Sequence, residues 1–409
     1  MIEAPPAVVV PPRAPAKPRD RAVPMRAWAA VLGTSAVALV ALQALGRSAE
    51  RVESWYAGAW SPAAGRAIAA ITGRVGVSVG ELLLLAAALG ALVLSARAAL
   101  DVLRGARRAA NALARGLAFG TGAAALLLVA FYALWGLNYK RPDIVRRLAL
   151  ERYDEGPERD PTELERLCAS LAAGVNRDYE LATGGRDAGA PSAPSLPVSE
   201  IDRRIDAGYE RVAARLSLGD AFAASRGPAK PVLFSMGMSY AGIAGIYDPF
   251  TAEANYNRDL PACTIPEVIG HEKAHQRGIA SEDEANFMSF LACVASDDPY
   301  TRYSAYAFSL GQLSGDLRRA DPAAVDRVRA RLDPGPLRDY AERDRFWRRY
   351  EGVVERVGAK VNDTYLRANG DRRGIAAYGY STRLLVLFAR AHGGSVEAFL
   401  NPENAPRVP

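Results

Sequence analysis

Histidine and cysteine are both scarce in this chain of 409 residues, which has three of each. The cysteines form no Cys-x-x-Cys pair, and an odd number without such a pair excludes a cysteine-rich zinc module. The chain also lacks a nucleic-acid-binding motif, and its aromatic residues are not interleaved with a basic stripe, so nucleic acid is not an expected partner. The net charge of +6 is carried mostly by arginines near long apolar runs, which indicates membrane topology instead.

Two of the three histidines stand in one pentapeptide, His271-Glu272-Lys273-Ala274-His275. On a helix, positions i and i+4 lie on one face, so both imidazoles can bind one metal ion. Glu272 is then placed to take a proton from a metal-activated water, which is the layout of a zinc-dependent hydrolase. The alternative is a chance occurrence on a surface helix. With histidine this rare, composition alone produces the pattern in about one chain in a thousand.

The residues around this pentapeptide predict two helices. Thr264–Glu267 has the pattern of a capping box with proline in the first turn, so a helix is expected to begin there. Gly278 follows the second histidine by three residues and is expected to end that helix. Ser281–Glu284 repeats the capping pattern and predicts a second helix. A short turn between the two should fold the second helix back beside the first.

A catalytic zinc site needs a third protein ligand and an open fourth position. The first turn of the second helix offers Glu282, Asp283 and Glu284, although acidic residues there can also simply complement the helix dipole. We favour Glu282 as the ligand, with Glu284 as the alternative. The spacing of Glu282 and Asn286 is similar to the Glu-x-x-x-Asp element of the glutamate-type zincins. That resemblance implies that Glu282 binds zinc and that Asn286, in place of aspartate, orients a histidine.

A longer run, residues 271–293 (HEKAHQRGIASEDEANFMSFLAC), resembles an uncharacterised family of bacterial membrane proteins, domain of unknown function 3810. Three other stretches are similar to the same family: residues 134–139 (LWGLNY), residues 242–255 (GIAGIYDPF, then EAN) and residues 361–379 (VNDTYL, then YG). The likeness covers most of the chain. It implies a membrane-anchored metallopeptidase and no particular substrate. Lys273 departs from the pattern, because an apolar residue is common at that position.

Three apolar runs are long enough to cross a bilayer as helices: residues 27–45, 75–94 and 117–137. A cleavable signal peptide is the alternative for the first run, but further spans follow it. Glu81 lies inside the second run, so it is expected to have a partner or to lie near the membrane surface. Residues 1–26, which are rich in proline, alanine and arginine, are expected to form a disordered cytoplasmic tail.

The distribution of arginine and lysine predicts the orientation of these spans. The tail and the loop between the second and third runs carry five each, and the loop between the first two runs carries four. The more basic segments are expected on the cytoplasmic side. Residues 140–409 then lie on the extracytoplasmic side of a bacterial-type inner membrane. Tyr132, Trp135 and Tyr139, at the end of the third run, predict an aromatic belt at the interface.

The extracytoplasmic part is expected to be mostly helical. A low-complexity loop is predicted at residues 182–198, and helices are predicted at residues 161–181, 199–216, 300–318, 323–332, 337–369 and 376–391. The strand candidates are Pro231–Met236 and Gly242–Tyr247. The segment from Gly242 to Asn257 is either an edge strand that holds an extended substrate peptide, as in zincins, or part of a plain core hairpin.

Two further features each have two interpretations. Cys263 and Cys293 flank the two motif helices, and they either pair in a disulfide outside the cytoplasm or are buried free thiols. His392, the remaining histidine, either stabilises an oxyanion in the transition state or is simply exposed near the end of the chain. Tyr378 and Tyr380 are alternative oxyanion-stabilising residues.

Together these patterns predict a mainly α protein with three N-terminal transmembrane helices and a mostly helical, zincin-like (α+β) metallopeptidase domain. The expected function is hydrolysis of a peptide or protein substrate, with Zn²⁺ held by His271, His275 and Glu282 and with Glu272 as the base. One alternative is a zinc amidase that acts on cell-wall peptides. The other is a non-catalytic membrane scaffold or sensor with a structural or inactive metal site. The intact motif argues against the latter, because a structural site has no need of Glu272.

Overall fold

The computed structural model describes most of the chain, at residues 25–103, 106–154, 160–186, 189–369, 381–396 and 399. The polypeptide divides into two compact units. The first unit contains residues 1–36 and 88–127, and the second contains residues 37–87 and 128–409. Of the expected tail, residues 1–24 lie outside the described part of the chain.

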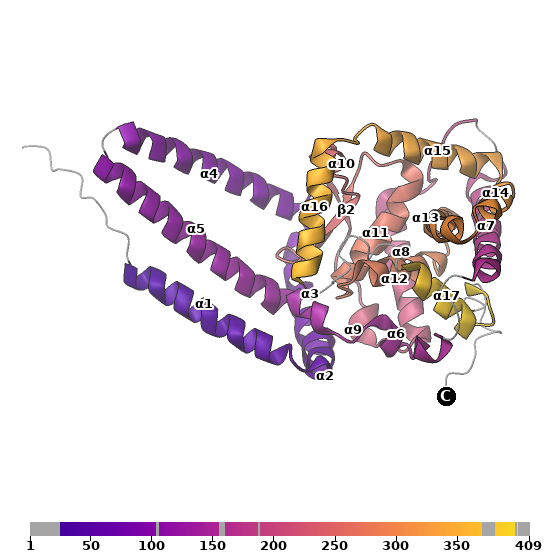
Figure 1. Ribbon diagram of the computed structural model, residues 1–409, viewed down its shortest axis with the longest axis horizontal. Coiled ribbons are helices and arrows are strands. Elements are labelled where there is room, and N and C mark those ends of the chain that lie inside the picture. Colours follow the sequence, from indigo (N-terminus) through magenta and orange to yellow (C-terminus); the bar gives the residue numbers. More distant parts are fainter. Residues whose placement is uncertain are drawn as a thin grey trace, which may run out of the picture. The chain divides into compact units, whose positions relative to one another are not determined.

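Three described helices are long and apolar enough to cross a membrane: α1 (Met25–Leu45), α4 (Val79–Leu103) and α5 (Ala106–Leu134) (Figure 1). Their exposed leucine-rich surfaces are expected where lipid is the solvent. Both ends of the second and third spans differ from the prediction, since these spans are Val79–Leu100 and Leu113–Leu134. Residues 73–78 form turns, and the 3-10 helix η2 (Gly136–Lys140) follows the third span, so neither segment lengthens a span.

The connection between the first two spans is helical rather than a simple loop. It comprises α2 (Ala49–Arg51), the π-helix η1 (Val52–Trp60) and α3 (Ser61–Thr72). Three of its side chains donate hydrogen bonds to the last three carbonyl groups of α5, in the pairs Tyr56–Tyr132, Trp60–Ala133 and Ser61–Leu134. Those carbonyls have no partner inside the helix. The connection therefore caps the last turn of α5, within the second unit.

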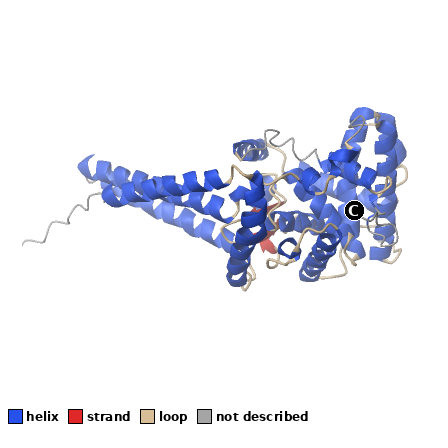
Figure 2. Ribbon diagram, turned by 90° about the horizontal axis from the view of Figure 1, so that it is seen from below, coloured by secondary structure: helices blue, strands red, loops and turns tan. Residues whose placement is uncertain are grey.

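Helices make up most of the second unit (Figure 2). The principal ones are α7 (Pro161–Thr183), α8 (Val198–Arg215), α11 (Ile265–Gln276), α12 (Glu282–Val294) and α13 (Pro299–Ala320). The side chains of residues 285–294 are all buried, as expected for a helix that is enclosed on every side. Helix α11 packs beside α12, as the two capping patterns predict. Cys168, Cys263 and Cys293 are free and buried, so Cys263 and Cys293 do not pair.

The second unit also contains a small three-stranded sheet of β1 (Lys230–Val232), β2 (Gly245–Asp248) and β3 (Glu253–Asn257). The order is β1-β3-β2, with β1 parallel and β2 antiparallel to β3. The first strand is shorter than the predicted Pro231–Met236, because the chain turns after Val232 into the short helix α10 (Ser235–Tyr240). The central strand β3 is fully buried, and the sequence pattern does not single it out.

The C-terminal helices differ from the prediction at one point. One helix is predicted for residues 337–369, but the chain forms α15 (Pro334–Arg348) and α16 (Val353–Ala368). Gly352 between them has a φ of 165°, which is extended and interrupts the helix. Residues 370–380 lie outside the described part, and α17 (Ser381–Ala391) follows. The remaining elements are α6 (Ile144–Arg147), η3 (Leu150–Tyr153), α9 (Asp220–Ala223), η4 (Ala262–Thr264) and α14 (Pro322–Arg329).

Candidate metal centre

The turn after α11 brings the two motif helices together. Gly278 has a φ of +82°, a left-handed conformation that suits glycine. Its N–H donates to the carbonyl of His275 at 2.9 Å, and the N–H of Ile279 donates to the carbonyl of Ala274 at 3.1 Å, which ends the helix as a Schellman-type turn. A Cβ at position 278 would also lie 3.0 Å from Asn138 Oδ1. The predicted stop at Gly278 is therefore confirmed.

The side-chain hydrogen bonds of the two predicted capping boxes do not form, because neither Thr264 nor Ser281 caps its helix. The Thr264 hydroxyl donates to the carbonyl of Pro261 at 2.7 Å instead of capping α11. The N–H of Glu267 is satisfied from another helix, by Ser304 Oγ at 3.2 Å. At the start of α12, the Ser281 hydroxyl donates to the carboxylate of Asp283. Both helices begin where the pattern predicts, but tertiary contacts and neighbouring side chains replace the local caps.

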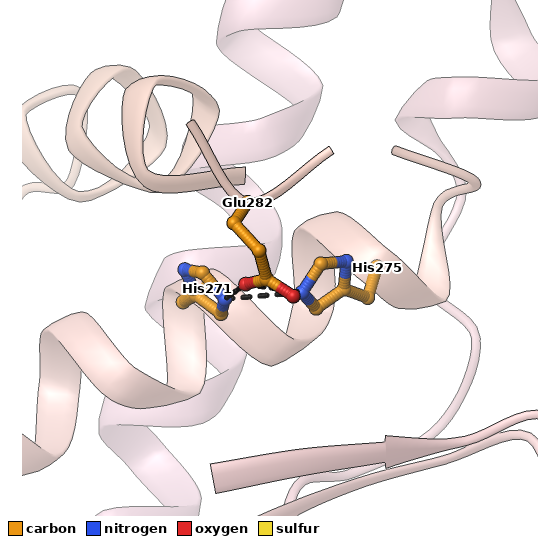
Figure 3. Close-up of side chains that lie close together, drawn as sticks. All are labelled: His271, His275 and Glu282. Atoms are coloured by element: carbon orange, nitrogen blue, oxygen red, sulfur yellow. Dashed lines mark hydrogen bonds and ion pairs between the residues drawn. The ribbon is translucent and has the colours of Figure 1, made fainter. Parts of the chain in front are cut away.

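Helices α11 and α12 bring His271, His275 and Glu282 together (Figure 3). The two Nε2 atoms are 3.0 Å apart. Oε2 of Glu282 lies 3.1 Å from Nε2 of His271 and 3.4 Å from Nε2 of His275. The three side chains are largely buried, with exposed fractions between 9% and 12%. The arrangement is a compact group of three potential metal-ligand atoms.

Hydrogen bonds on the far side of each imidazole fix its orientation. His275 Nδ1 lies 2.7 Å from the carbonyl of Ile279, and His271 Nδ1 lies 2.7 Å from Oδ1 of Asn286. Both partners are oxygen acceptors, so each Nδ1 carries the hydrogen and each Nε2 keeps its lone pair. Both lone pairs are then available to the space beside Glu282. The predicted orienting partner Asn286 is in contact with His271, which is the position that a supporting residue needs.

This donor set fits a divalent metal ion. In a tetrahedral zinc site with bonds of about 2.0–2.1 Å, neighbouring ligand atoms are about 3.3 Å apart. The separations of 3.0, 3.1 and 3.4 Å match that spacing. Two imidazole lone pairs and a carboxylate that face one another in a buried space repel unless a proton or a cation lies among them. The geometry and the chemistry therefore both agree with a two-histidine, one-glutamate metal site.

The shifted pKa values of His271 and Glu282 also show that this group favours a bound positive charge. Burial opposes protonation of His271, but its hydrogen bond to Glu282 and the nearby carboxylates of Glu272 and Glu267 outweigh burial and raise its pKa to about 9. Burial also acts on Glu282, yet the two histidines prevail and hold its pKa below the usual range. A proton shared by these groups is what a metal ion would displace on binding.

Glu272 lies in the same buried space, against strand β2. It is 5% exposed. A Cβ on Gly245 would come within 2.5 Å of its Oε1, so the absent side chain at that position makes room for the carboxylate. Burial raises the pKa of Glu272, and His271, His275 and a backbone hydrogen bond from Tyr247 oppose the rise only in part. The structure thus places a carboxyl group of raised pKa between the histidines and the start of β2.

Glu284, the alternative third ligand, is not part of the group. Its Oε1 accepts a hydrogen bond at 2.8 Å from the N–H of Ile144, which begins α6. Burial and the neighbouring Asp283 raise the pKa of Glu284 to about 7. Of the two glutamates, the structure brings Glu282 and not Glu284 to the histidines. Helical periodicity explains the difference, because two residues along a helix turn a side chain by about 200°.

Trp135 contacts the metal centre, and this contact is not predicted from the sequence. It is 5% exposed, and its Nε1 donates to the carbonyl of His275 at 2.9 Å. Its ring also packs edge-on against the imidazole of His275 and beside Tyr247 of β2. Trp135 therefore does not present an exposed ring to the predicted aromatic belt at the interface, since its ring is buried and bonded to α11. Its only sequence signal is the family-like stretch at residues 134–139.

The opposite side of α11 is held by a buried ion-pair network. The ammonium group of Lys273 lies 2.9 Å from a carboxylate oxygen of Asp206 and 3.0 Å from one of Asp202, both on α8. Arg277 adds a bond of 2.8 Å to Asp206, and its guanidinium group lies over the ring of Tyr209. A lysine thus occupies this usually apolar position for a structural reason, because its ion pairs attach α11 to α8.

The other candidate residues lie elsewhere. His392 contacts the carbonyl of Phe388 through Nδ1 at 2.7 Å, and its ring packs against Phe388 and Phe399, so the structure gives it no place in the metal group. Tyr378 and Tyr380 lie outside the described residues. A tyrosine from the same family-like stretch, Tyr365 of α16, does approach the centre, since Glu282 contributes to the raised pKa that burial imposes on its hydroxyl.

Comparison with known proteins adds a family but no function. The model of a family described as "Protein of unknown function (DUF3810)" matches residues 56–386, which is most of the chain. No curated protein and no solved structure matches the chain. The matched region contains the second and third spans, the sheet and the whole metal group. Any function must therefore be argued from the geometry of this site.

Proposed function

The chain belongs to the DUF3810 family, and on that premise we propose that it is a membrane-anchored, zinc-dependent metallopeptidase. The observation that carries the proposal is the convergence of His271, His275 and Glu282, with the buried Glu272 close enough to interact electrostatically with all three. A structural metal site needs four ligands and no base, whereas a catalytic one has three protein ligands, an open position and a base. The arrangement of these four side chains corresponds to the second kind.

The residues of the chain divide the chemical work between them. His271, His275 and Glu282 would hold the cation, which when bound supplies Lewis-acid activation of a water molecule and of the substrate carbonyl. Glu272 accepts a proton from that water while the oxygen of the water bonds to the carbonyl carbon of the substrate. Glu272 then gives the proton to the leaving amine nitrogen as the C–N bond breaks. Burial raises the pKa of Glu272, which is the direction that favours a group that both accepts and releases a proton.

Strand β2 provides a place for the substrate backbone. Among the described residues it pairs with a strand on one side only, with β3. The Tyr247 N–H bonds the Glu272 carboxylate, and the remaining backbone groups on the outer edge can hydrogen-bond an extended peptide. The strand begins at Gly245, which touches the carboxylate of Glu272. A peptide added to this edge would run past the base. This supports the edge-strand interpretation of residues 242–257 over a plain core hairpin.

The membrane spans complete the proposal. Three candidate spans make the chain a multi-pass membrane protein. From the distribution of arginine and lysine we infer that the membrane is a bacterial-type inner membrane and that the metal centre is on its extracytoplasmic side. Substrates would then be peptides or proteins outside the cytoplasm. Labelling of a cysteine introduced at exposed Arg329, by a membrane-impermeant thiol reagent applied to intact cells, tests this side directly.

The decisive experiment on catalysis compares the full-length protein with Glu272→Gln, both loaded with zinc in detergent. Each is incubated with a mixture of proteome-derived peptides and, separately, with cell-wall peptides, and products are identified by mass spectrometry. We expect cleavage by the wild type and at least a ~10²-fold lower rate in the variant, with zinc content unchanged. Cleavage confined to cell-wall peptides would favour the amidase. Equal behaviour of the two proteins would contradict catalysis and leave the scaffold.

A further inference from the structure

Helix α16 turns its apolar side outward. Four residues at four-residue spacing form a stripe along it: Val353, Val357, Val361 and Tyr365. Val354 borders this stripe. The exposed fractions of the five side chains lie between 40% and 67%. The only buried residue of the helix is Leu366. A surface helix of a water-soluble domain buries its apolar stripe, so this orientation needs an apolar or interfacial partner.

One end of α16 is attached to the end of a membrane span. The ring of Tyr365 packs edge-on against Phe131 in the last turn of α5, and against Tyr139 just after it, with centroid distances of 6.4 Å in both cases. The hydroxyl groups of Tyr365 and Tyr139 are 3.4 Å apart. Since the third span ends at Leu134, these contacts place the C-terminal end of α16 at the boundary of the bilayer.

The N-terminal half of α16 is attached, through α10, to the start of another span. Gly358 packs so closely on Ala241 that a Cβ there would lie 2.6 Å from the Ala241 carbonyl oxygen. Just before α10, the N–H groups of Leu233 and Phe234 donate to the carboxylate of Glu81, at 2.8 and 2.7 Å. Glu81 lies in the first turn of α4, where the second span begins. These bonds also give Glu81 the partner that an acidic residue at this depth requires.

The segment around α10 repeats the exposure of α16. Four of its apolar residues are between 44% and 62% exposed: Leu233, Phe234, Met236 and Tyr240. Figure 1 shows α10 beside one end of α16 within the second unit. The two exposed apolar surfaces are therefore neighbours, and each is bonded to the membrane-boundary end of a span.

We propose that α16 and residues 233–240 form a lipid-contacting surface that lies in the headgroup layer of the membrane that the spans cross. Two attachment points at span ends hold α16 along that layer rather than away from it. At 100° per residue, the exposed cations Arg356 and Lys360 flank the stripe, where their long side chains can reach lipid phosphates. This is the composition of an interfacial helix, with an apolar side in the lipid boundary and basic residues at its margin.

The same contacts hold the metal centre next to the bilayer. From the stripe, ring contacts run from Tyr365 to Tyr139, from Tyr139 to Trp135 and from Trp135 to His275. Trp135 follows the last residue of the third span. If the proposed peptidase function holds, substrates that reach the site are segments close to the membrane surface. The lipid-contacting surface itself stands independently of that function.

Probe depth in a bilayer tests this surface without any measurement of activity. Full-length Val357→Cys and Val361→Cys are labelled with an environment-sensitive fluorophore and placed in nanodiscs of phosphatidylethanolamine and phosphatidylglycerol. Cys168, Cys263 and Cys293 are buried, and burial raises the pKa of Cys168 and Cys263 to about 12, so the introduced thiol reacts preferentially. The matched control is exposed Arg329→Cys on α14, which Figure 1 draws at the far side of the same unit.

We expect lipids brominated near the headgroup to remove most of the fluorescence at positions 357 and 361 and to leave position 329 unchanged. Equal accessibility of all three probes to an aqueous quencher, with no lipid quenching, would overturn the proposal. A second copy of the chain is the other possible occupant. In that case lipids would not quench the probes in single-copy nanodiscs, and the probes would quench one another only in two-copy nanodiscs. This result would assign the stripe to an interface between two copies and would refute lipid contact.

Discussion

Helix α11 carries buried polar groups on two opposite sides, and the sides differ in the source of their positive charge. Facing α8, Lys273 and Arg277 supply cations to the carboxylates of Asp202 and Asp206. Facing α12, two imidazole nitrogens and the Glu282 carboxylate meet, and within the described part of the chain no lysine or arginine is bonded to them. The first cluster is complete in itself and is structural. The second has no such partner among the described residues and could be completed by a cation from outside, as a metal-binding site would be.

The largest effect on the free energy of unfolding is expected from a change to the ion-pair network that faces α8. Lys273→Met leaves Asp202 and Asp206 buried with one cation fewer, and removal of one partner from a buried ion pair costs about 3–5 kcal/mol in the free energy of unfolding. A thermal or denaturant unfolding measurement in detergent detects the loss. The double variant Asp202→Asn with Lys273→Met removes the orphaned charge and should recover part of it. Unchanged stability in Lys273→Met would show that the network does not hold α11.

A smaller effect is expected from loosening the metal side. Asn286→Ala removes the oxygen that orients His271, and loss of such a supporting group lowers metal affinity by about 10–100-fold. Asn286→Asp is the matched control, because a carboxylate accepts the same Nδ1 hydrogen bond more strongly. Competition with a metal-sensitive dye measures both affinities. Equal affinity in wild type and Asn286→Ala would remove Asn286 from the site.

The smallest effect is expected at the contact between the base and the edge strand. Gly245→Ala puts a methyl group against the Glu272 carboxylate, and overpacking of this kind costs about 1–3 kcal/mol. We expect a reduced hydrolysis rate with unchanged metal content. Gly315→Ala, where nothing lies within 4 Å, is the control and should behave as wild type. A fully active Gly245→Ala would show that this close approach does not position Glu272.

Short-range patterns in the sequence predict the frame of the centre well. The HExxH spacing places His271 and His275 on one face, and Gly278 ends the helix where expected. The three apolar runs appear as three candidate spans, with shifted ends. The mainly helical fold with a small sheet is also confirmed. Each of these features depends on residues within a few turns of one another, so local periodicity and turn chemistry are sufficient.

Features that depend on distant contacts could not be predicted. The ring of Trp135 is recruited to His275 across 140 positions of sequence, although its place at the end of an apolar run suggests lipid. Glu284 looks as suitable a ligand as Glu282, and only its bond to Ile144 shows that it faces another helix. Strand β3 has the sequence EANYN, which alternates polar and apolar residues like a half-exposed strand, yet all five residues are buried. Such features arise from packing rather than from local sequence.

Metal content tests the central claim most directly. The full-length protein is purified beside Glu282→Gln and its near-isosteric control Glu284→Gln, and each is reconstituted with zinc, dialysed and measured by mass spectrometry of the metal. We predict about one zinc ion per chain in wild type and in Glu284→Gln, and loss of the ion in Glu282→Gln. Wild-type protein that retains no metal after reconstitution, or retention in Glu282→Gln with loss in Glu284→Gln, would contradict the site described here.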